Sequence, residues 1–467
     1  MTTPPTSPQL PPGPSAPRLL QSWRFAARPR SSLDDSFARY GDAFTARILG
    51  MGTVVVVSNR EAIRDLFTAD PDVVVTGASN RRLFEALLGT HSLLNLDGDR
   101  HLRKRKLLTP AFHGQRMHLY GHAMREAARR TMAGWRVGEP FTIAEAMRDI
   151  TLEVILRVIF GVDDHEQRTR TGAVVLDFLE FFYRPEAAAL GLSAAQVDLG
   201  PRSPWGRMLR TRAPLYQRIE EAIAARRAAG TEGREDILSM LIDARDEDGQ
   251  GLSDQELRDD LFTLLLVGHE TTAASLTWGF WTLLRRREIV SKLRAEYREV
   301  MGAGPLDPAR LGAMPYLDAV VKEILRVHPV TDGAARFLTE PCVLGPLHLP
   351  AGVMVAASTW LTHHNPALWQ RPREFWPERF LLSKPATYSW LPFGGGPRRC
   401  IGAAFASFEM KIVLSEFLNH ASLRVEPDYH PTVARRAITL CAKGGVPVRL
   451  LAPVADPDHP LAPEHRP

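Results

Sequence analysis

Residues 391–403, Leu-Pro-Phe-Gly-Gly-Gly-Pro-Arg-Arg-Cys-Ile-Gly-Ala, contain the one cysteine whose neighbours suit metal ligation. The three consecutive glycines can adopt turns that other residues cannot, so the chain can bend tightly beneath a flat ligand. From Cys400 onward the spacing of apolar residues predicts a helix, which places this cysteine at a helix N-terminus. Free backbone amides and the helix dipole stabilise a thiolate there.

A thiolate in this loop has the surroundings that a cysteinate-ligated haem iron requires, because Arg398 can pair with an anionic group nearby. An isolated cysteine is more often only a small buried hydrophobe. Cys400 is not isolated, and its neighbours follow the spacing Phe393-x-x-Gly396-x-Arg398-x-Cys400-x-Gly402. This pattern resembles the haem-binding signature of the cytochrome P-450 family at every defined position.

The resemblance covers about residues 23–450 and implies a mainly α fold with a smaller β region, a triangular helical prism around a buried haem b. A chain of 467 residues with 45% hydrophobic residues can bury such a core. We therefore expect a single domain at residues 21–452. It should lie between a proline-rich, poorly ordered segment at residues 1–20 and a flexible tail at residues 453–467.

Composition and charge exclude several classes of protein. The net charge of +5 is modest and no basic stripe is interleaved with aromatic residues, so nucleic-acid binding is not expected. No run of about 20 apolar residues could span a bilayer, and the N-terminus does not resemble a signal peptide. Cys342, Cys400 and Cys441 are too scattered for a disulfide framework, which favours a reducing compartment. Within the family the chain resembles the soluble bacterial type, for which we expect a cytoplasmic monomer.

The clearest regular elements are a hairpin and a long helix. Phe44–Ile48 and Thr53–Val57 flank two glycines and predict a β-hairpin. Ser253 followed by Glu256 predicts a capping box, and the helical pattern then continues to about Arg286. Such a helix is roughly 50 Å long and could cross a whole domain.

The middle of this long helix reads Val-Gly-His-Glu-Thr-Thr and places Glu270 beside Thr271. Burying an acid and a hydroxyl costs free energy unless the pair is hydrogen-bonded or useful. The stretch resembles the family's central-helix motif, which implies that the pair delivers protons to dioxygen, with Thr271 on the distal oxygen and Glu270 relaying protons through water. The alternative, common in helices, is a threonine bonded to its own helix and a solvent-facing glutamate.

The neighbours of this pair have expected roles of their own. Gly268 leaves room for a diatomic molecule. Val267 lies one turn before Thr271 on the same face and narrows the pocket. We expect His269 to be a helix-packing histidine rather than a second iron ligand.

Two short motifs predict a structural network behind the cofactor. Tyr316–His328 reads as a helix in which Glu323 and Arg326 share a face and can pair. Downstream, the sequence Pro-Glu-Arg-Phe offers Arg379. Together these residues resemble the family's Glu-x-x-Arg and Pro-Glu-Arg-Phe triad, which implies a structural rather than a catalytic role. The alternative is a generic surface pair, which would contribute under ~1 kcal/mol.

Haem carries two propionates, and buried carboxylates call for cations. His101-Leu-Arg-Lys-Arg105 resembles the family's propionate-contacting helix, with His101 where many members carry tryptophan and bacterial members often carry histidine. Arg336 and Arg398 match two further propionate partners. The resemblance thus implies a cofactor-binding set of His101, Arg105, Arg336, Phe393, Arg398, Cys400 and Gly402, with Cys400 as the metal ligand.

Three further basic residues in or next to this stretch need a separate interpretation. Arg103, Lys104 and Lys106 cannot all face inward, so some of them must be solvated. As a cluster near the cysteine side they could dock an acidic redox partner. A plain solvated face is an equal alternative.

The resemblance also implies where the substrate pocket lies. Its walls should come from residues 72–96, from residues 178–205 with Phe181, Phe182 and Tyr183, from the central helix and from residues 330–335. The residues expected in the pocket are Leu264, Val267, Val330, Thr331 and Ala334. They are mostly apolar and suggest a hydrophobic small molecule such as a fatty acid, terpenoid, steroid or polyketide. For the aromatic cluster, simple helix packing is an equal alternative.

These features together predict a haem-thiolate monooxygenase that activates dioxygen and inserts one oxygen atom, by hydroxylation or epoxidation. No flavin domain, nicotinamide fingerprint or iron–sulfur cysteine cluster occurs in the chain, so electrons should come from a separate ferredoxin and ferredoxin reductase. A peroxide-driven peroxygenase is one alternative, although such members tend to lack the acid–alcohol pair. A haem-binding sensor or carrier without turnover is another.

Overall fold

A computed structural model describes residues 7–114, 116–162, 164–181, 196–436 and 438–455. The helices are α1 (Arg18–Ala27), α2 (Pro29–Tyr40), α3 (Arg60–Thr68), α4 (Gly77–Leu88), α5 (Gly98–Leu108), α6 (Arg116–Ala133), α7 (Ile143–Phe160), α8 (His165–Phe181), α9 (Pro204–Ala229), α10 (Ile237–Asp243), α11 (Asp254–Leu283), α12 (Arg287–Met301), α13 (Pro315–Val327), α14 (Thr359–His364), α15 (Arg379–Leu382) and α16 (Ala403–His420). The strands are β1 (Ala43–Ile48), β2 (Gly52–Val57), β3 (Val74–Val75), β4 (Pro140–Thr142), β5 (Gly333–Leu338), β6 (Cys342–Leu344), β7 (Leu347–Leu349), β8 (Met354–Ser358), β9 (Leu423–Val425), β10 (Val433–Arg436), β11 (Thr439–Ala442) and β12 (Pro447–Leu450).

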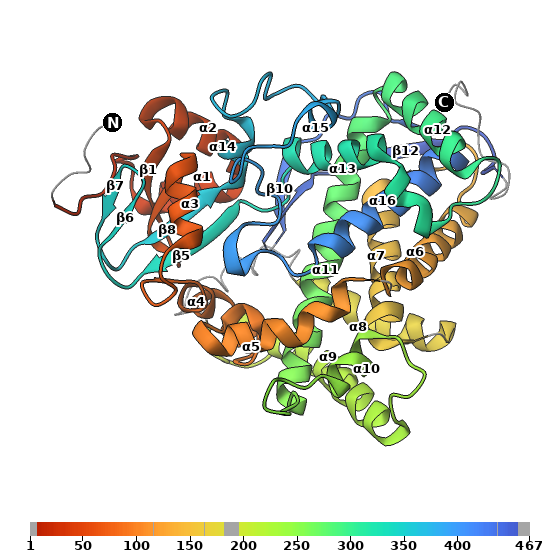
Figure 1. Cartoon of the computed structure of the whole chain (residues 1–467), viewed down its shortest axis with the longest axis horizontal. Coiled ribbons are helices and arrows are strands. Elements are labelled where there is room, and N and C mark those ends of the chain that lie inside the picture. Colours follow the sequence, from red (N-terminus) through yellow and green to blue (C-terminus); the bar gives the residue numbers. More distant parts are fainter. Residues whose placement is uncertain (1–6, 115, 163, 182–195, 437, 456–467) are drawn as a thin grey trace.

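The helices and the largest sheet occupy different sides of the molecule. Figure 1 shows β1, β2 and β5–β8 on one side, most of the helices on the other, and α11 running between them. This arrangement confirms the expected mainly α fold with a smaller β region. Among the described residues, no helix is long and apolar enough to cross a membrane.

The largest sheet has the strand order β1-β2-β8-β5-β3. The predicted hairpin is present, with β1 antiparallel to β2 and Phe44 opposite Val56. Successive valines of β2 are buried on opposite faces of the sheet. Val55 packs in one cluster with Ile63 of α3, and Val54 packs in another with Trp360 of α14. The sheet is therefore covered on both faces by helices that follow or precede its strands.

The long central helix begins as its capping box predicts. The Ser253 side chain accepts from the amide of Glu256, and the Glu256 side chain accepts from the amide of Ser253. The helix α11 has 30 residues, so it is about 45 Å long. It ends at Leu283, three residues before the predicted Arg286, because the chain turns there into α12. The second predicted helix also agrees closely, since α13 spans Pro315–Val327.

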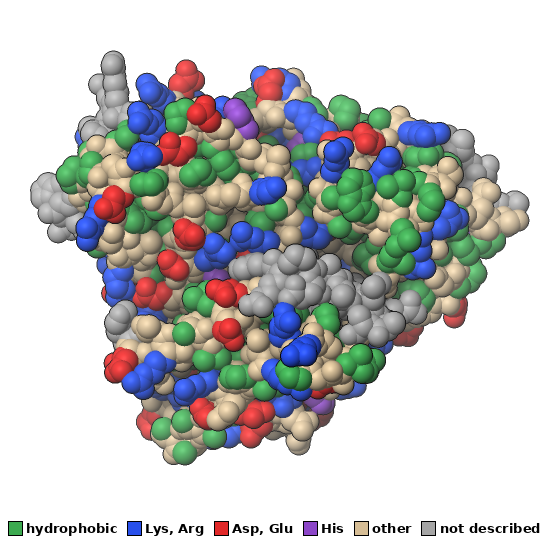
Figure 2. Space-filling model, turned by 180° about the vertical axis from the view of Figure 1, so that it is seen from behind, with side chains coloured by type: hydrophobic (Ala, Val, Ile, Leu, Met, Phe, Trp, Pro, Cys, Tyr) green, Lys and Arg blue, Asp and Glu red, His purple; other side chains and the backbone are tan. Residues whose placement is uncertain are grey.

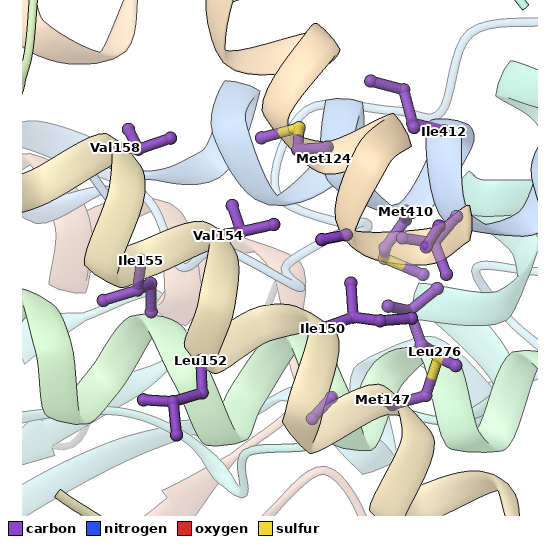
Figure 3. Close-up of a cluster of buried hydrophobic side chains, with 14 of the residues drawn as sticks. Met124, Met147, Ile150, Leu152, Val154, Ile155, Val158, Leu276, Met410 and Ile412 are labelled. Carbon is purple, nitrogen blue, oxygen red and sulfur yellow. The ribbon is translucent and has the colours of Figure 1, made fainter. Parts of the chain in front are cut away.

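The core of the helical part forms around α7, which packs against α6 and α11. Figure 3 shows side chains of α6, α7, α11 and α16 meeting there, among them Met124, Leu276 and Met410. Val154 of α7 is fully buried in this cluster. These contacts hold α11 and α16, the two helices that carry the motifs of the central helix and the cysteine loop, in fixed positions relative to each other.

The helix after the cysteine starts later than predicted. It begins at Ala403 rather than at Cys400, because the amide of Cys400 donates to the carbonyl of Phe393 at 2.9 Å and closes the preceding loop. Residues 401–402 form a turn between loop and helix. Cys400 thus lies just before the first turn of α16.

The described part of the N-terminal segment lies against strands. Gln9 donates to the carbonyl of His348 at 2.9 Å, and Thr45 donates to the carbonyl of Pro12 at 3.1 Å. Helix α1 already begins at Arg18. The division into a segment at 1–20, a domain at 21–452 and a tail at 453–467 stays a prediction. Residues 1–6 and 456–467 lie outside the described residues.

Candidate active site

A large cavity of about 1670 Å³ lies where the cysteine loop, α5, α11 and the segment at residues 330–336 meet. This volume is larger than that of a typical pocket for one drug-sized ligand, which is about 300–1,000 Å³. The cavity therefore has room for a flat cofactor and a second molecule. Further wall comes from α1, α2 and the β1–β2 hairpin.

Cys400 lines this cavity. Its side chain has accessible surface because it faces the cavity, although it lies deep in the protein. Burial raises the pKa of the Cys400 thiol above its usual value, while the amide of Gly402 and the guanidinium groups of Arg105 and Arg399 act in the opposite direction. The helix N-terminus thus favours a thiolate as expected, but burial outweighs it in the protein alone.

The glycines before Cys400 permit both a sharp turn of the loop and its close packing against α3. Gly394 and Gly396 have φ angles of +67° and +65°, in the left-handed region that favours glycine. A Cβ on Gly395 would approach Cδ2 of Phe67 to 2.5 Å, and one on Gly396 would approach the carbonyl oxygen of Phe67 to 2.3 Å. The loop therefore turns sharply and also rests directly on α3.

Four of the residues expected near the propionates line the cavity together: His101, Arg105, Arg336 and Arg398. His101 is buried on α5, and burial together with Arg398 and Arg105 lowers its pKa to about 3, so the imidazole is neutral. Burial and the neighbouring Arg398 lower the pKa of Arg336 to about 10, which leaves it charged at neutral pH.

The partners of these arginines show how the charge is balanced. Arg398 forms an ion pair with Asp97 at 2.7 Å and donates to the carbonyl of Leu96. Arg336 donates to the adjacent carbonyl of Ala335 at 2.8 Å. Arg105 forms no ion pair with a carboxylate among the described residues. Three guanidinium groups therefore line one wall with Asp97 beside them, an excess of positive charge that suits the two propionates of haem.

The donor set and the space thus fit haem: a cysteine in the wall, a loop bent by glycines, a neutral histidine and three guanidinium groups on one cavity. Asp97 is a site residue that the sequence reasoning missed. It lies in Leu-Asp-Gly-Asp just before α5, and its Oδ1 also accepts from the amide of Gly77 at 2.7 Å. An acidic residue directly before a basic helix was the available signal.

The acid–alcohol pair on α11 also lines the cavity. Thr271 Oγ1 donates to the carbonyl of Val267 at 2.7 Å, as in the helix-bonded alternative. The Glu270 side chain is 14% exposed, and its Oε1 lies 3.9 Å from Nε2 of His269. Both side chains border the cavity, so the structure is compatible with either role.

The neighbouring residues of α11 differ in their surroundings. His269 is buried, and its Nδ1 lies 2.8 Å from Thr151 Oγ1 of α7. Burial lowers its pKa to about 3, so it is a neutral packing residue. A Cβ on Gly268 would come within 3.2 Å of Ile155 Cδ1, so this glycine also lets α11 approach α7 closely.

The residues expected in the substrate pocket all lie in the cavity wall: Leu264, Val267, Val330, Thr331 and Ala334. The predicted flanking segments contribute Phe84, Leu94, Leu179 and Trp205, among others. The aromatic cluster divides differently. Phe178 packs on Phe262 in the core with ring centroids 5.3 Å apart, and Phe181 is buried. Phe182 and Tyr183 lie outside the described residues.

The structure brings Glu323, Arg326 and Arg379 together in one buried network. Arg326 donates to both carboxylate oxygens of Glu323, at 2.7 and 2.8 Å, and Arg379 donates to Glu323 at 3.2 Å. Arg326 also binds the carbonyls of His363 and Glu374. The Glu323 and Arg326 side chains have no exposed surface, so this is not a surface pair.

The basic residues of α5 do not form one exposed cluster. Lys104 is 1% exposed and lies 3.0 Å from Asp260 of α11, so it cannot meet a partner protein. Arg103 pairs with Asp246 at 2.5 Å, and the exposed Lys106 pairs with Glu247 at 2.9 Å. On the face shown in Figure 2, basic and acidic side chains are likewise interspersed. The prediction of a docking cluster is wrong for Lys104, because that side chain is needed to neutralise a buried acid.

A helical fold with these groups around one cavity is that of a haem-binding oxidoreductase. A family model for cytochrome P450 matches residues 8–443. The chain is 36% identical to putative cytochrome P450 137 of Mycobacterium tuberculosis over 412 residues, which is 88% of this chain and 83% of that protein. It is 38% identical to putative cytochrome P450 135B1 of Mycobacterium bovis over 422 residues, 89% of this chain and 85% of that protein.

Solved structures agree with these sequence relationships. A retinoic acid-bound cyanobacterial CYP120A1 superimposes with a TM-score of 0.82 at 26% identity, covering 97% of this chain and 100% of that chain. The haem domain of cytochrome P450DA matches the fold with a TM-score of 0.84 at 22% identity, covering 97% and 99%. The chain belongs to the cytochrome P450 family. It is a haem monooxygenase, an oxidoreductase, and its cofactor is haem b.

Proposed function

We propose that Cys400 supplies the thiolate ligand of the haem iron and that Arg105, Arg336 and Arg398 hold the propionates. The main observation that supports this proposal is that this cysteine and the three guanidinium groups line one cavity. His101 stands beside them as a neutral hydrogen-bonding group, since its pKa is lowered to about 3 by burial and the nearby arginines. Phe393 and Gly402 complete this set, because the Phe393 carbonyl and the Gly402 amide fix the backbone and thiol of Cys400.

Haem held by a thiolate supplies the redox chemistry that splits dioxygen and transfers one oxygen atom to an organic substrate. The protein supplies position and protons. In this proposal Thr271 hydrogen-bonds to the dioxygen unit, and Glu270 relays protons to it through water. Thr271 can do so by turning its hydroxyl away from the carbonyl of Val267, which accepts it in this structure.

We propose a hydrophobic small molecule as substrate, hydroxylated at a C–H bond or epoxidised at an alkene. The residues Leu264, Val267, Val330 and Ala334, which are apolar, line the cavity and support this class. The relative solved with retinoic acid shows that a closely similar fold can hold a lipophilic acid. We further propose that a separate ferredoxin and ferredoxin reductase supply electrons, in a reducing, cytoplasmic setting that agrees with three free cysteines.

The ligand assignment is tested by replacing Cys400. The Cys400→Ala variant should lose the red-shifted Soret band that the reduced carbonyl complex of a thiolate-ligated haem shows. Haem content should be measured on the same samples, because propionate and apolar contacts can retain haem without the thiolate. An unchanged band in a variant that still contains haem would overturn the assignment.

A further inference from the structure

The side chain of His363, on α14, lies between the buried Glu323 network and the loop at residues 391–400 that leads to the cysteine. His363 has no exposed surface. Its Nε2 atom lies 2.7 Å from the amide nitrogen of Leu391, and its Nδ1 atom lies 3.0 Å from the carbonyl oxygen of Arg326. One imidazole ring therefore connects the end of α13 to the first residue of this loop.

The two partners fix the state of the imidazole ring. A backbone amide can only donate a hydrogen bond and a carbonyl oxygen can only accept one, so Nε2 carries the lone pair and Nδ1 carries the proton. Burial and the charge of Arg326 lower the pKa of His363 to about 3, so the ring is neutral at physiological pH. Both ring nitrogens are therefore used, and only this tautomer satisfies both partners.

The link between His363 and Arg326 runs in both directions. Arg326 Nη1 donates to the carbonyl oxygen of His363 at 2.8 Å, while its Nε and Nη2 atoms bind the carboxylate of Glu323. The ring of His363 also packs edge-on against Trp369, with ring centroids 6.4 Å apart and an angle of 78° between the planes. The imidazole is therefore held in one orientation relative to α13.

Leu391 connects the imidazole of His363 to the rest of the loop. The carbonyl of Leu391 accepts from the amide of Gly394 at 3.1 Å, and the carbonyl of Phe393 accepts from the amide of Cys400 at 2.9 Å. Leu391 is buried and lines the cavity. Because the glycines of the loop restrict its backbone little, the position of the loop depends on hydrogen bonds at its ends.

We propose that His363 is a positioning residue for the Cys400 thiolate and acts through the amide of Leu391. The Nε2 atom fixes the start of the loop relative to α13 and so holds the sulfur in the place from which it ligates the iron. This inference rests on the proposed function, since it needs Cys400 as the ligand. The bond to Arg326 holds the ring, whereas the bond to Leu391 acts on the ligand.

The test removes the two bonds of the ring one at a time. The amide oxygen of His363→Gln can take the place of Nε2 and accept from Leu391, whereas the amide nitrogen of His363→Asn can take the place of Nδ1 and donate to Arg326. Each haem-loaded variant is reduced under carbon monoxide, and the ratio of the red-shifted thiolate band to the blue-shifted band of haem without a thiolate is recorded. His363→Asn should lower this ratio by about 10–100-fold, because the buried amide of Leu391 loses its acceptor, and His363→Gln should resemble wild type.

Further measurements separate positioning of the loop from stability of the whole protein. Urea unfolding should show the two His363 variants to be similarly stable, because each loses one buried hydrogen bond. Hydrogen exchange of peptides that cover residues 388–400 should be faster in His363→Asn than in His363→Gln. The matched control is His364, whose Nδ1 lies 2.9 Å from the carbonyl oxygen of Trp360 in the same helix and whose ring packs on that residue. His364→Asn and His364→Gln should leave the band ratio unchanged.

The inference and the proposed function fail through different results. Absence of the thiolate band from the wild-type protein contradicts the assignment of Cys400 as the ligand, whatever the His363 variants show. If the band ratio of His363→Asn is no lower than that of His363→Gln, or if neither variant folds, the positioning role is overturned and His363 only stabilises the core. Loss of haem from His363→Asn alone supports the role, because only that variant lacks the bond to the loop.

Discussion

Lys104 of α5 and Asp260 of α11 form an ion pair of 3.0 Å in which each side chain is 1% exposed. Asp260 Oδ1 also accepts from the amide of Leu93 at 2.8 Å, so the pair fixes the segment before α5 on the central helix. Both His101 of α5 and Glu270 of α11 line the cavity. This buried pair therefore sets the relative position of two walls of the active site.

Replacing Lys104 should be strongly destabilising. Lys104→Met leaves the carboxyl group of Asp260 buried without its cation, which costs about 3–5 kcal/mol in comparable cases. Urea unfolding followed by circular dichroism measures the effect. Lys106→Met is the matched control, since its pair with Glu247 is exposed and its removal should leave the free energy of unfolding nearly unchanged. Equal effects of the two substitutions would contradict the burial argument.

Glu409 on α16 should make the protein less stable as the pH rises. Burial raises the pKa of its carboxyl group to about 8, and Oε1 has no hydrogen-bond partner among the described residues. Between the ordinary pKa and this raised value the unfolded chain releases a proton that the folded protein keeps. Stability should therefore fall by up to about 1.4 kcal/mol per pH unit from this group.

The check is the free energy of unfolding of wild type and Glu409→Gln between pH 5 and pH 8. The two proteins should be similar at the acidic end, and the variant should become the more stable one toward pH 8. Glu416→Gln provides a contrast in sign, because Glu416 accepts from Arg129 at 3.0 Å and the substitution should destabilise the protein by removing a buried ion pair. A constant difference between wild type and Glu409→Gln would refute the raised pKa.

Thr271→Ala should uncouple the reaction while haem and substrate still bind. Without the hydroxyl, protons reach the reduced dioxygen in the wrong position, and the dioxygen unit leaves as hydrogen peroxide before its O–O bond is broken. Proton-transfer contributions of this kind amount to about 10²–10⁴-fold. The measurement is product formed per reduced nicotinamide consumed, with peroxide assayed alongside. Thr271→Ser keeps the hydroxyl and should retain most of the coupling. If the alanine variant is as well coupled as wild type, the bond to Val267 is the threonine's whole role.

Glu323→Gln should disrupt folding more than any exposed acid does. The substitution removes the carboxylate that accepts from both Arg326 and Arg379 in a buried site, which costs about 3–5 kcal/mol. Haem-loaded yield and thermal unfolding report the loss. The comparison is Glu374→Gln, whose side chain is 57% exposed in a pair with Arg371 and which should behave like wild type. Wild-type behaviour of both variants would remove the structural role.

Short-range sequence patterns predicted several of these features well. The hairpin, the capping box of Ser253 and the pairing of Glu323 with Arg326 depend on residues a few positions apart, and local geometry decides them. The start of α16 could not be predicted in this way, because the carbonyl of Phe393 captures the amide of Cys400 across a loop.

Features that depend on packing between elements far apart in the sequence could not be predicted. Nothing near Lys104 in the sequence indicates that Asp260 will be its partner 156 positions later, so its burial could not be inferred. The contribution of α1 and β10 to the cavity wall was missed for a similar reason. Phe25 of α1 lies against Arg435 of β10, and the proline-rich start of the chain gave no sign that residues so close to it face the cavity.

The segment that precedes α1 forms part of the cavity wall. Pro14, Ser15 and Ala16 border the cavity, and Gln21 ties them down by donating to the carbonyls of Pro14 and Ala16 at 3.0 and 2.7 Å. Trimming the protein to residue 18 for expression or crystallisation would open the cavity to water on that side. Ligand affinities measured on such a shortened protein would therefore differ from those of the full-length chain, because part of the cavity wall would be missing.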